Sequence, residues 1–173
     1  KDILLIGTPS LEAQFAAEGY TVRAAKPRAV VLGFDTTITY DKLRLLCDAV
    51  RAGLPYIATH PDFNCPTETG FVPDIGAIMA FIQASTGRKA DLIIGKPHGE
   101  IVRAACERTG LAPSQMAVVG DRLYTDIACG VNAGIDTALV LSGETKEADL
   151  VGSAVQPTFV LGRVADYLSI LQE

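Results

Sequence analysis

The sequence predicts an α/β fold built around a largely parallel sheet. Runs rich in Ile, Leu and Val alternate along the chain with segments whose apolar residues recur at the helical period. Gly, Pro, Asn and Ser stand between these segments as turn residues. Because strand and helix keep alternating, successive strands are expected to lie parallel, with helices covering the sheet.

The first half of the chain is predicted, in order, as strand 2–6, helix 11–18, strand 29–33, helix 40–52, strand 56–59, loop 60–73 and helix 75–85. Gly19 and Gly53 follow the first two helices, as glycine commonly does at helix ends. From Leu43, apolar residues recur at i+3, i+4 and i+7, which makes the second helix amphipathic. The loop is dense in Pro, Asn, Asp, Thr and Gly, and loops of that length often carry function.

The second half is predicted, in order, as strand 91–94, helix 100–109, strand 116–119, helix 124–133, strand 136–141 and helix 164–171. A turn-rich stretch, Gly87-Arg88-Lys89, separates the two halves. We therefore expect two compact units of similar size, residues 1–88 and 89–173.

Composition and charge exclude several classes of protein. Hydrophobic residues make up 49% of the 173 residues and charged residues 20%, as in a folded globular protein. The formal charge is −5 and no Lys/Arg run is present, which argues against nucleic acid as a partner. No apolar run is long enough to span a bilayer, so no membrane association is expected. Four cysteines without a Cys-x-x-Cys pair favour free thiols in the cytoplasm.

The strongest chemical signal is an apolar strand that ends in Gly120-Asp121, with Asp126 five residues later. Carboxylates at the carboxyl end of a parallel strand lie where open α/β sheets bind ligands. Asp126 falls in the first turn of the next helix and can point back toward the same place. Two such oxygen donors suit a hard cation such as Mg²⁺. The alternative is that Asp126 only caps its helix while Asp121 lies in a solvated turn.

A second signal is Gly95-Lys96-Pro97, again after a strand, which is expected to present an ammonium at the same edge of the sheet. Lys96 could there neutralise the charge of a phosphoryl group and of a carboxylate. The alternative is an ordinary turn lysine in solvent. The spacing of a Walker A loop and that of a dinucleotide-binding loop are both absent.

Taken together, GKP followed by GDRLYTDIACGVNAGIDTALVLSG resembles the third and fourth motifs of haloacid dehalogenase (HAD) phosphatases. Upstream, VVLGFDTTITYDKL and IATHPDFNCPTETGFVPDIGAI resemble the cap of the class IIA branch, the para-nitrophenyl phosphatase and phosphoglycolate phosphatase-like enzymes. The resemblance implies an α/β C2-type cap at residues 1–88. It also implies the C-terminal half of a HAD-like Rossmannoid core at 89–173.

The resemblance also implies a function and roles for single residues. It implies a Mg²⁺-dependent phosphomonoesterase acting on a small phosphorylated metabolite through an aspartyl-phosphate. Asp121 would be a metal ligand, Asp126 a second or water-mediated partner of the metal, and Lys96 the catalytic cation that also contacts the phosphate. The remaining implied substrate contacts are His60, Asp62, Asn64 and Arg122. Association of copies through the cap is also compatible with the resemblance.

The family's nucleophile motif is missing from the sequence. No Asp-x-Asp follows an apolar strand, and Asp35, which follows one, lacks the second Asp and aligns with the cap. The chain also starts at Lys1 without a Met. We therefore expect the nucleophile in an upstream segment and no turnover by these residues alone. The alternative is a non-catalytic module that binds phosphate and metal.

Overall fold

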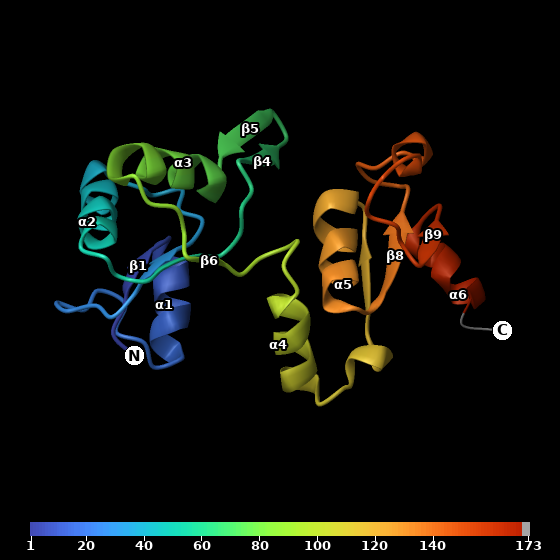
Figure 1. Ribbon diagram of the computed structural model, residues 1–173, viewed down its shortest axis with the longest axis horizontal. Coiled ribbons are helices and arrows are strands. Elements are labelled where there is room, and N and C mark those ends of the chain that lie inside the picture. The colour runs from blue at the N-terminus through green and yellow to red at the C-terminus, as the bar shows by residue number, and fades with distance from the viewer. Residues whose placement is uncertain (171–173) are drawn as a thin grey trace. The chain divides into compact units, whose positions relative to one another are not determined.

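The structure, a computed structural model, describes residues 1–170 and divides the chain into two compact units, Lys1–Ile94 and Gly95–Glu173 (Figure 1). The first unit extends six residues beyond the expected boundary at Arg88. The reason is that strand β6 (Leu92–Ile93) pairs with β3 (Tyr56–Ala58) of the first unit. No helix within residues 1–170 is both long enough and apolar enough to cross a membrane.

The first unit contains a parallel four-stranded sheet in the order β1 (Leu4–Ile6), β2 (Val30–Leu32), β3 and β6. Its helices are α1 (Pro9–Ala17), α2 (Tyr40–Arg51) and α3 (Ile75–Thr86). Each helix begins at a residue whose side chain accepts a backbone N–H of the first turn: Thr8, Thr39 and Asp74. The predicted strands and helices of this unit are therefore confirmed, with boundaries that differ by one or two residues.

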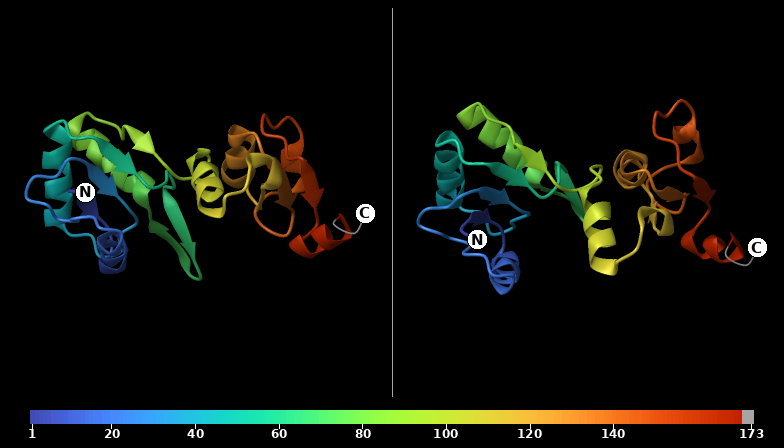
Figure 2. Two further views of the ribbon diagram at one scale, coloured as in Figure 1. Left: turned by 90° about the horizontal axis from the view of Figure 1, so that it is seen from below. Right: turned by 60° about the horizontal axis from the view of Figure 1, so that its bottom comes forward.

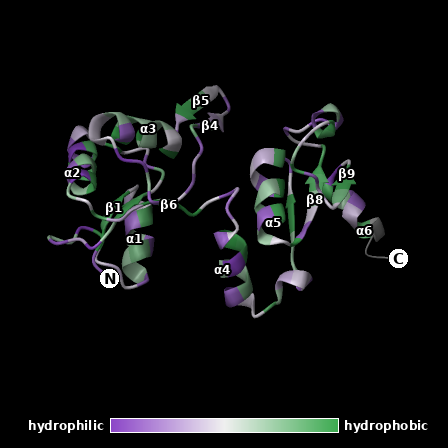
Figure 3. Ribbon diagram, in the orientation of Figure 1, coloured by the Kyte–Doolittle hydropathy of each residue, from purple (hydrophilic) through white to green (hydrophobic). Residues whose placement is uncertain are grey.

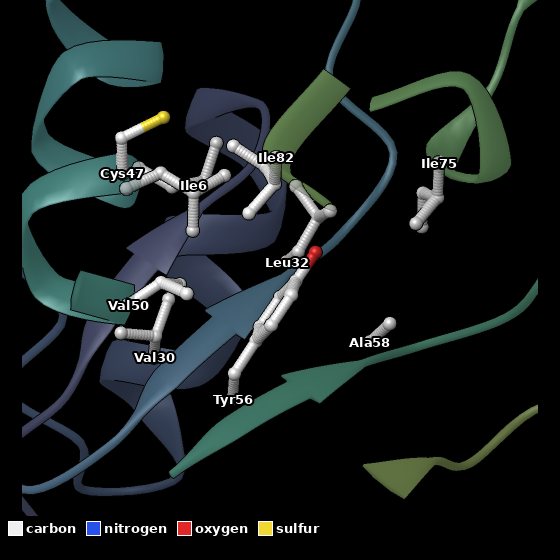
Figure 4. Close-up of a cluster of buried hydrophobic side chains, with 10 residues drawn as sticks. Ile6, Val30, Leu32, Cys47, Val50, Tyr56, Ala58, Ile75 and Ile82 are labelled. Carbon is white, nitrogen blue, oxygen red and sulfur yellow. The ribbon is translucent and has the colours of Figure 1, made fainter. Parts of the chain in front are cut away.

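The larger of the two hydrophobic clusters of the first unit lies between the sheet and helices α2 and α3, while Ile3, Leu5 and Val31 pack with Leu11 and Phe15 of α1. Figure 4 shows Val30, Leu32 and Tyr56 on β2 and β3, facing Val50 of α2 and Ile82 of α3. All five side chains are fully buried. Figure 3 shows strands β1 and β8 as hydrophobic, whereas helices α2 and α4 also carry hydrophilic residues. The apolar runs of the sequence thus form the sheet and pack against the apolar faces of the helices.

The expected loop at 60–73 contains a β-hairpin, so that prediction was wrong for most of its length. Strands β4 (Asn64–Thr67) and β5 (Gly70–Pro73) pair antiparallel around a two-residue turn, and Figure 2 shows them projecting from the first unit. Pro66 and Pro73 argued against strands from sequence alone, because proline lacks the backbone N–H that a strand donates to its neighbour. A two-stranded ribbon tolerates proline because each strand has one free edge.

The second unit contains the parallel sheet β7 (Ala117–Gly120), β8 (Asp136–Val140) and β9 (Phe159–Leu161), in that order. Strand β9 was not predicted. Two reciprocal hydrogen bonds hold its entry beside β8: the Thr137 N–H donates to the Thr158 hydroxyl at 3.0 Å, and the Thr158 N–H to the Thr137 hydroxyl at 2.9 Å. Such pairing depends on residues far apart in sequence, which local patterns do not report.

The helices of the second unit are α4 (Glu100–Thr109), α5 (Ala128–Ala133) and α6 (Tyr167–Ile170). Helix α4 has the predicted bounds. The predicted helix 124–133 is instead a π-turn, Leu123–Ile127, followed by the shorter α5. The predicted helix 164–171 starts as a 3₁₀ turn, Val164–Asp166, before α6, and Leu171 lies outside the described residues.

Candidate active site

The carboxyl end of β7 brings the side chain of Asp126 against the backbone of Gly120. Asp126 belongs to the π-turn Leu123–Ile127 and is 8% exposed. A Cβ added at Gly120 would collide with the Asp126 side chain, so only glycine fits at this position. The Gly-Asp pattern of the sequence therefore marks a real close approach between a strand end and the segment that follows it.

Lys96 and Asp126 form an ion pair, with 2.5 Å between the Nζ and Oδ1 atoms. The other carboxylate oxygen of Asp126 accepts the Arg122 N–H at 3.2 Å. The Lys96 side chain is 48% exposed and that of Asp126 only 12%. Asp126 is thus held from two sides, while the ammonium of Lys96 keeps a face toward solvent.

The route by which Lys96 reaches Asp126 differs from the expected one. We expected the strand before Lys96 to share a sheet with β7, but β6 pairs with β3 in the first unit. The segment after Lys96 is instead bound to α5. The Asn132 side-chain amide donates to the Pro97 carbonyl at 2.8 Å, and the Cys129 thiol to the His98 carbonyl at 3.2 Å. These bonds position Lys96 next to Asp126 within the second unit.

Asp121, the residue after β7, is bound by the loop that follows β8. Its Oδ2 atom accepts the Glu144 N–H at 2.9 Å, and its carbonyl accepts the Thr145 N–H at 3.1 Å. A Cβ at Gly143 would collide with the Asp121 carboxylate, so the loop can close on Asp121 only with glycine there. Asp121 and Asp126 therefore have different protein partners, and their joint binding of one cation stays a prediction.

A second ion pair lies next to Asp121. The Arg122 Nε atom is 2.7 Å from Glu144 Oε2, and the Tyr124 hydroxyl donates to Glu144 Oε1 at 2.8 Å. Burial lowers the pKa of Arg122, but the nearby charges of Glu144 and Asp121 outweigh this effect and raise the pKa above its usual value. Sequence analysis missed Glu144, because its contacts with Asp121, Arg122 and Tyr124 depend on how the loop after β8 folds.

The candidates His60, Asp62 and Asn64, which were expected in a cap, lie in the first unit. The Nε2 atom of His60 is 2.9 Å from Asp74 Oδ1, and its Nδ1 atom is 3.1 Å from the Thr59 hydroxyl oxygen. Ligand atoms of His60, Asp62 and Asp74 all lie within 4.8 Å of one another. Asn64 is exposed at the start of the hairpin. Their contact with a substrate stays a prediction.

Asp35, the residue that most resembles a nucleophile after a strand, is engaged in the first unit. Its Oδ2 atom is 2.6 Å from the Lys42 Nζ atom, and its Oδ1 atom accepts the N–H and the hydroxyl of Thr37. Its side chain is 1% exposed. Both carboxylate oxygens therefore hold the segment between β2 and α2 in place. These contacts give Asp35 a structural role.

Asp35→Asn is expected to destabilise the first unit at pH 7 by about 1.5–3 kcal/mol, as for hydrogen bonds to a charged group. Burial alone would raise the pKa of Asp35, but the hydrogen bonds from Lys42 and Thr37 outweigh it and lower the pKa below 3.8. A carboxyl with a lowered folded-state pKa stabilises the fold above its unfolded pKa, and this contribution is lost as the pH falls through the folded pKa. Urea unfolding should therefore show the difference between the two proteins shrinking below pH 3.8.

Asp41→Asn provides the matched control for that experiment. The Asp41 side chain is 83% exposed on the same helix that carries Lys42, so its replacement should change little. Equal stability of Asp35→Asn and the wild type at pH 7 would show that Asp35 is not a structural ion-pair partner.

Comparison with known proteins adds the family context. The HAD-hydrolase-like family model matches residues 93–167. An acid sugar phosphatase of Staphylococcus epidermidis is 41% identical over 130 residues, 75% of this chain and 50% of that protein. The 5′-nucleotidase YutF of Bacillus subtilis is 33% identical over 166 residues, 96% of this chain and 64% of that protein.

Solved structures of similar proteins have the same fold as this chain. The 4-nitrophenylphosphatase of Thermotoga maritima superposes with a TM-score of 0.91 at 49% identity, over 97% of this chain and 64% of that one. NagD of E. coli superposes with a TM-score of 0.88 at 32% identity, over 96% of this chain and 65% of that one. The chain thus spans between half and about two thirds of the length of these proteins.

Proposed function

Because the chain belongs to the HAD-like hydrolases, we propose that it is part of a phosphatase that hydrolyses monoesters of small phosphorylated metabolites. The observation that carries the proposal is the ion pair between Lys96 and Asp126. It lies at the carboxyl end of β7, and Asp121 is the first residue after that strand. A cation and two carboxylates at such a strand end suit the binding of a charged phosphoryl group together with a metal ion.

The donor set at this strand end fits Mg²⁺. Asp121 uses Oδ2 for the Glu144 N–H, while its Oδ1 accepts no hydrogen bond from any residue that the structure describes. That leaves one hard, charged oxygen open for a divalent cation, and Mg²⁺ commonly takes only one or two protein carboxylates. When bound, Mg²⁺ would offset negative charge on the phosphoryl oxygens. We propose Asp121 as its direct ligand and Asp126 as an indirect one.

Lys96 has a separate task in the proposed reaction. Its ammonium is held by Asp126 and is about half exposed, so it can contact a phosphoryl oxygen without losing its partner. Charge on the phosphoryl oxygens and on an attacking carboxylate would repel each other, and a fixed ammonium between them reduces that repulsion. Asp126 then acts as the positioning residue of Lys96.

The nucleophile is proposed to be an aspartate outside these 173 residues. The sequence holds no Asp-x-Asp after an apolar strand, and Asp35 is fully engaged. The unpaired edge of β7 supports this proposal. Among the described strands, β7 pairs only with β8, and Val119 on β7 is 45% exposed. A parallel strand added to the free edge of β7 would end beside Asp121 and could present an aspartate there.

The substrate is proposed to be selected by the first unit, as the cap. The relatives named above include an acid sugar phosphatase and a 5′-nucleotidase. His60, Asp62 and Asn64 are the proposed substrate contacts of the first unit, and Arg122 is a proposed substrate contact of the second unit. Sugar phosphates and nucleoside monophosphates are therefore the first two classes to assay.

The direct test is phosphate release by the full-length polypeptide that contains these residues. We expect hydrolysis of para-nitrophenyl phosphate and of at least one sugar phosphate or nucleoside monophosphate, abolished by EDTA and restored by Mg²⁺. Absence of hydrolysis across both substrate classes in the presence of Mg²⁺ would favour a non-catalytic module that binds phosphate and metal.

A further inference from the structure

The side chain of Glu144 joins three elements around Asp121. Its backbone N–H binds Asp121 Oδ2, while its carboxylate binds the Arg122 guanidinium at 2.7 Å and the Tyr124 hydroxyl at 2.8 Å. Arg122 directly follows Asp121, and Tyr124 lies in the π-turn that also carries Asp126. One residue of the loop after β8 therefore binds both the proposed metal ligand, Asp121, and the guanidinium of the residue that follows it.

Arg122 would compete with a metal ion if it were not held. The negative charge of Asp121 is one of the causes that raise the pKa of the Arg122 guanidinium. Guanidinium and carboxylate readily form paired hydrogen bonds, and the open Oδ1 of Asp121 is an acceptor for them. In the structure, however, the ion pair of Arg122 is made with Glu144. The carboxylate of Glu144 therefore keeps the guanidinium of Arg122 off the Asp121 oxygen that a divalent cation needs.

We propose that Glu144 is a positioning residue that keeps Asp121 available to the divalent cation by holding Arg122. This inference rests on the proposed function, because it takes Asp121 as the metal ligand. It assigns a task to a residue that does not itself bind metal or substrate. The side chain of Glu144 is 48% exposed, so its replacement should leave the fold intact.

Binding of Mn²⁺ alone to the full-length protein tests this proposal without any turnover. Mn²⁺ is a suitable probe because carboxylate sites that bind Mg²⁺ also bind Mn²⁺. The concentration of free Mn²⁺ is measured by electron paramagnetic resonance. Glu144→Gln is expected to weaken Mn²⁺ binding by about tenfold, as is common when the support of a metal ligand is removed. The double variant Glu144→Gln/Arg122→Gln should regain most of that affinity, because the competing guanidinium is gone.

Tyr124→Phe is the matched control. It removes the other hydrogen bond to the Glu144 carboxylate and leaves the Glu144–Arg122 ion pair in place, so Mn²⁺ affinity should change by less than about twofold. Unchanged affinity in Glu144→Gln would overturn the proposal, and so would a loss that the Arg122 substitution fails to reverse. Asp121→Asn separates this from the proposed function: if Mn²⁺ binding survives that change, Asp121 is not the ligand and the metal site itself is wrong.

Discussion

Asp121→Asn in the full-length polypeptide is expected to lower Mg²⁺-dependent hydrolysis of para-nitrophenyl phosphate by about 1000-fold. The substitution keeps the shape of the side chain and an acceptor for the Glu144 N–H, but it removes the charge that the cation needs. Metal ions contribute several kcal/mol of charge stabilisation in such reactions. A loss of about 4 kcal/mol corresponds to the expected change in rate. Initial rates over a Mg²⁺ titration measure the effect.

Asp136→Asn is the control for this experiment. Asp136 is an exposed carboxylate at the first residue of β8, where it lies opposite Ala117 at the other end of β7 from Asp121. Its replacement should leave the rate within about twofold of wild type, as for surface changes away from the site. Full activity of Asp121→Asn at saturating Mg²⁺ would contradict the assignment of Asp121 as metal ligand.

Lys96→Met is expected to lower the turnover of the full-length enzyme by about 100- to 1000-fold, the usual cost of removing one group that stabilises transition-state charge. It should also lower the melting temperature, because the carboxylate of Asp126 is left without its cation at 12% exposure. The double variant Lys96→Met/Asp126→Asn removes that unpaired charge. It should therefore regain stability without regaining activity, which thermal melts and rate assays measure side by side.

Lys26→Met serves as the control for Lys96, because Lys26 is an exposed lysine in the first unit. Both its stability and its activity should match those of wild type. If Lys96→Met/Asp126→Asn recovered turnover together with stability, Lys96 would be a structural partner of Asp126 and not the catalytic cation.

Local patterns predicted most of the fold because the helices and buried strands are encoded locally. Helix α4 has the predicted bounds, and β1, β2 and β3 lie inside the predicted strands. Strand pairing between segments that are distant in the sequence could not be predicted as well. The sheet to which β6 belongs is decided by its contacts with β3, and the short strand β9 depends on the bonds between Thr137 and Thr158.

The candidate site was predicted in its residues and only partly in its arrangement. Lys96 and Asp126 do meet, because the segment after Lys96 is bound to α5 by Asn132 and Cys129. The π-turn that carries Asp126 was read as a plain helix, since the pattern of apolar residues is nearly the same in both. Glu144 could not be identified from spacing, because its role follows from three contacts made in the folded loop.

The location of the proposed covalent phosphoaspartate tests the central claim most directly. The full-length enzyme would be mixed with substrate and Mg²⁺, quenched in acid and reduced with borohydride, which converts a phosphorylated aspartate to homoserine. Peptide mapping by mass spectrometry then locates that residue. We expect it outside the 173 residues described by this sequence, in a segment that ends an apolar strand with Asp-x-Asp. Homoserine in place of Asp35, or of any other aspartate of this chain, would contradict the account.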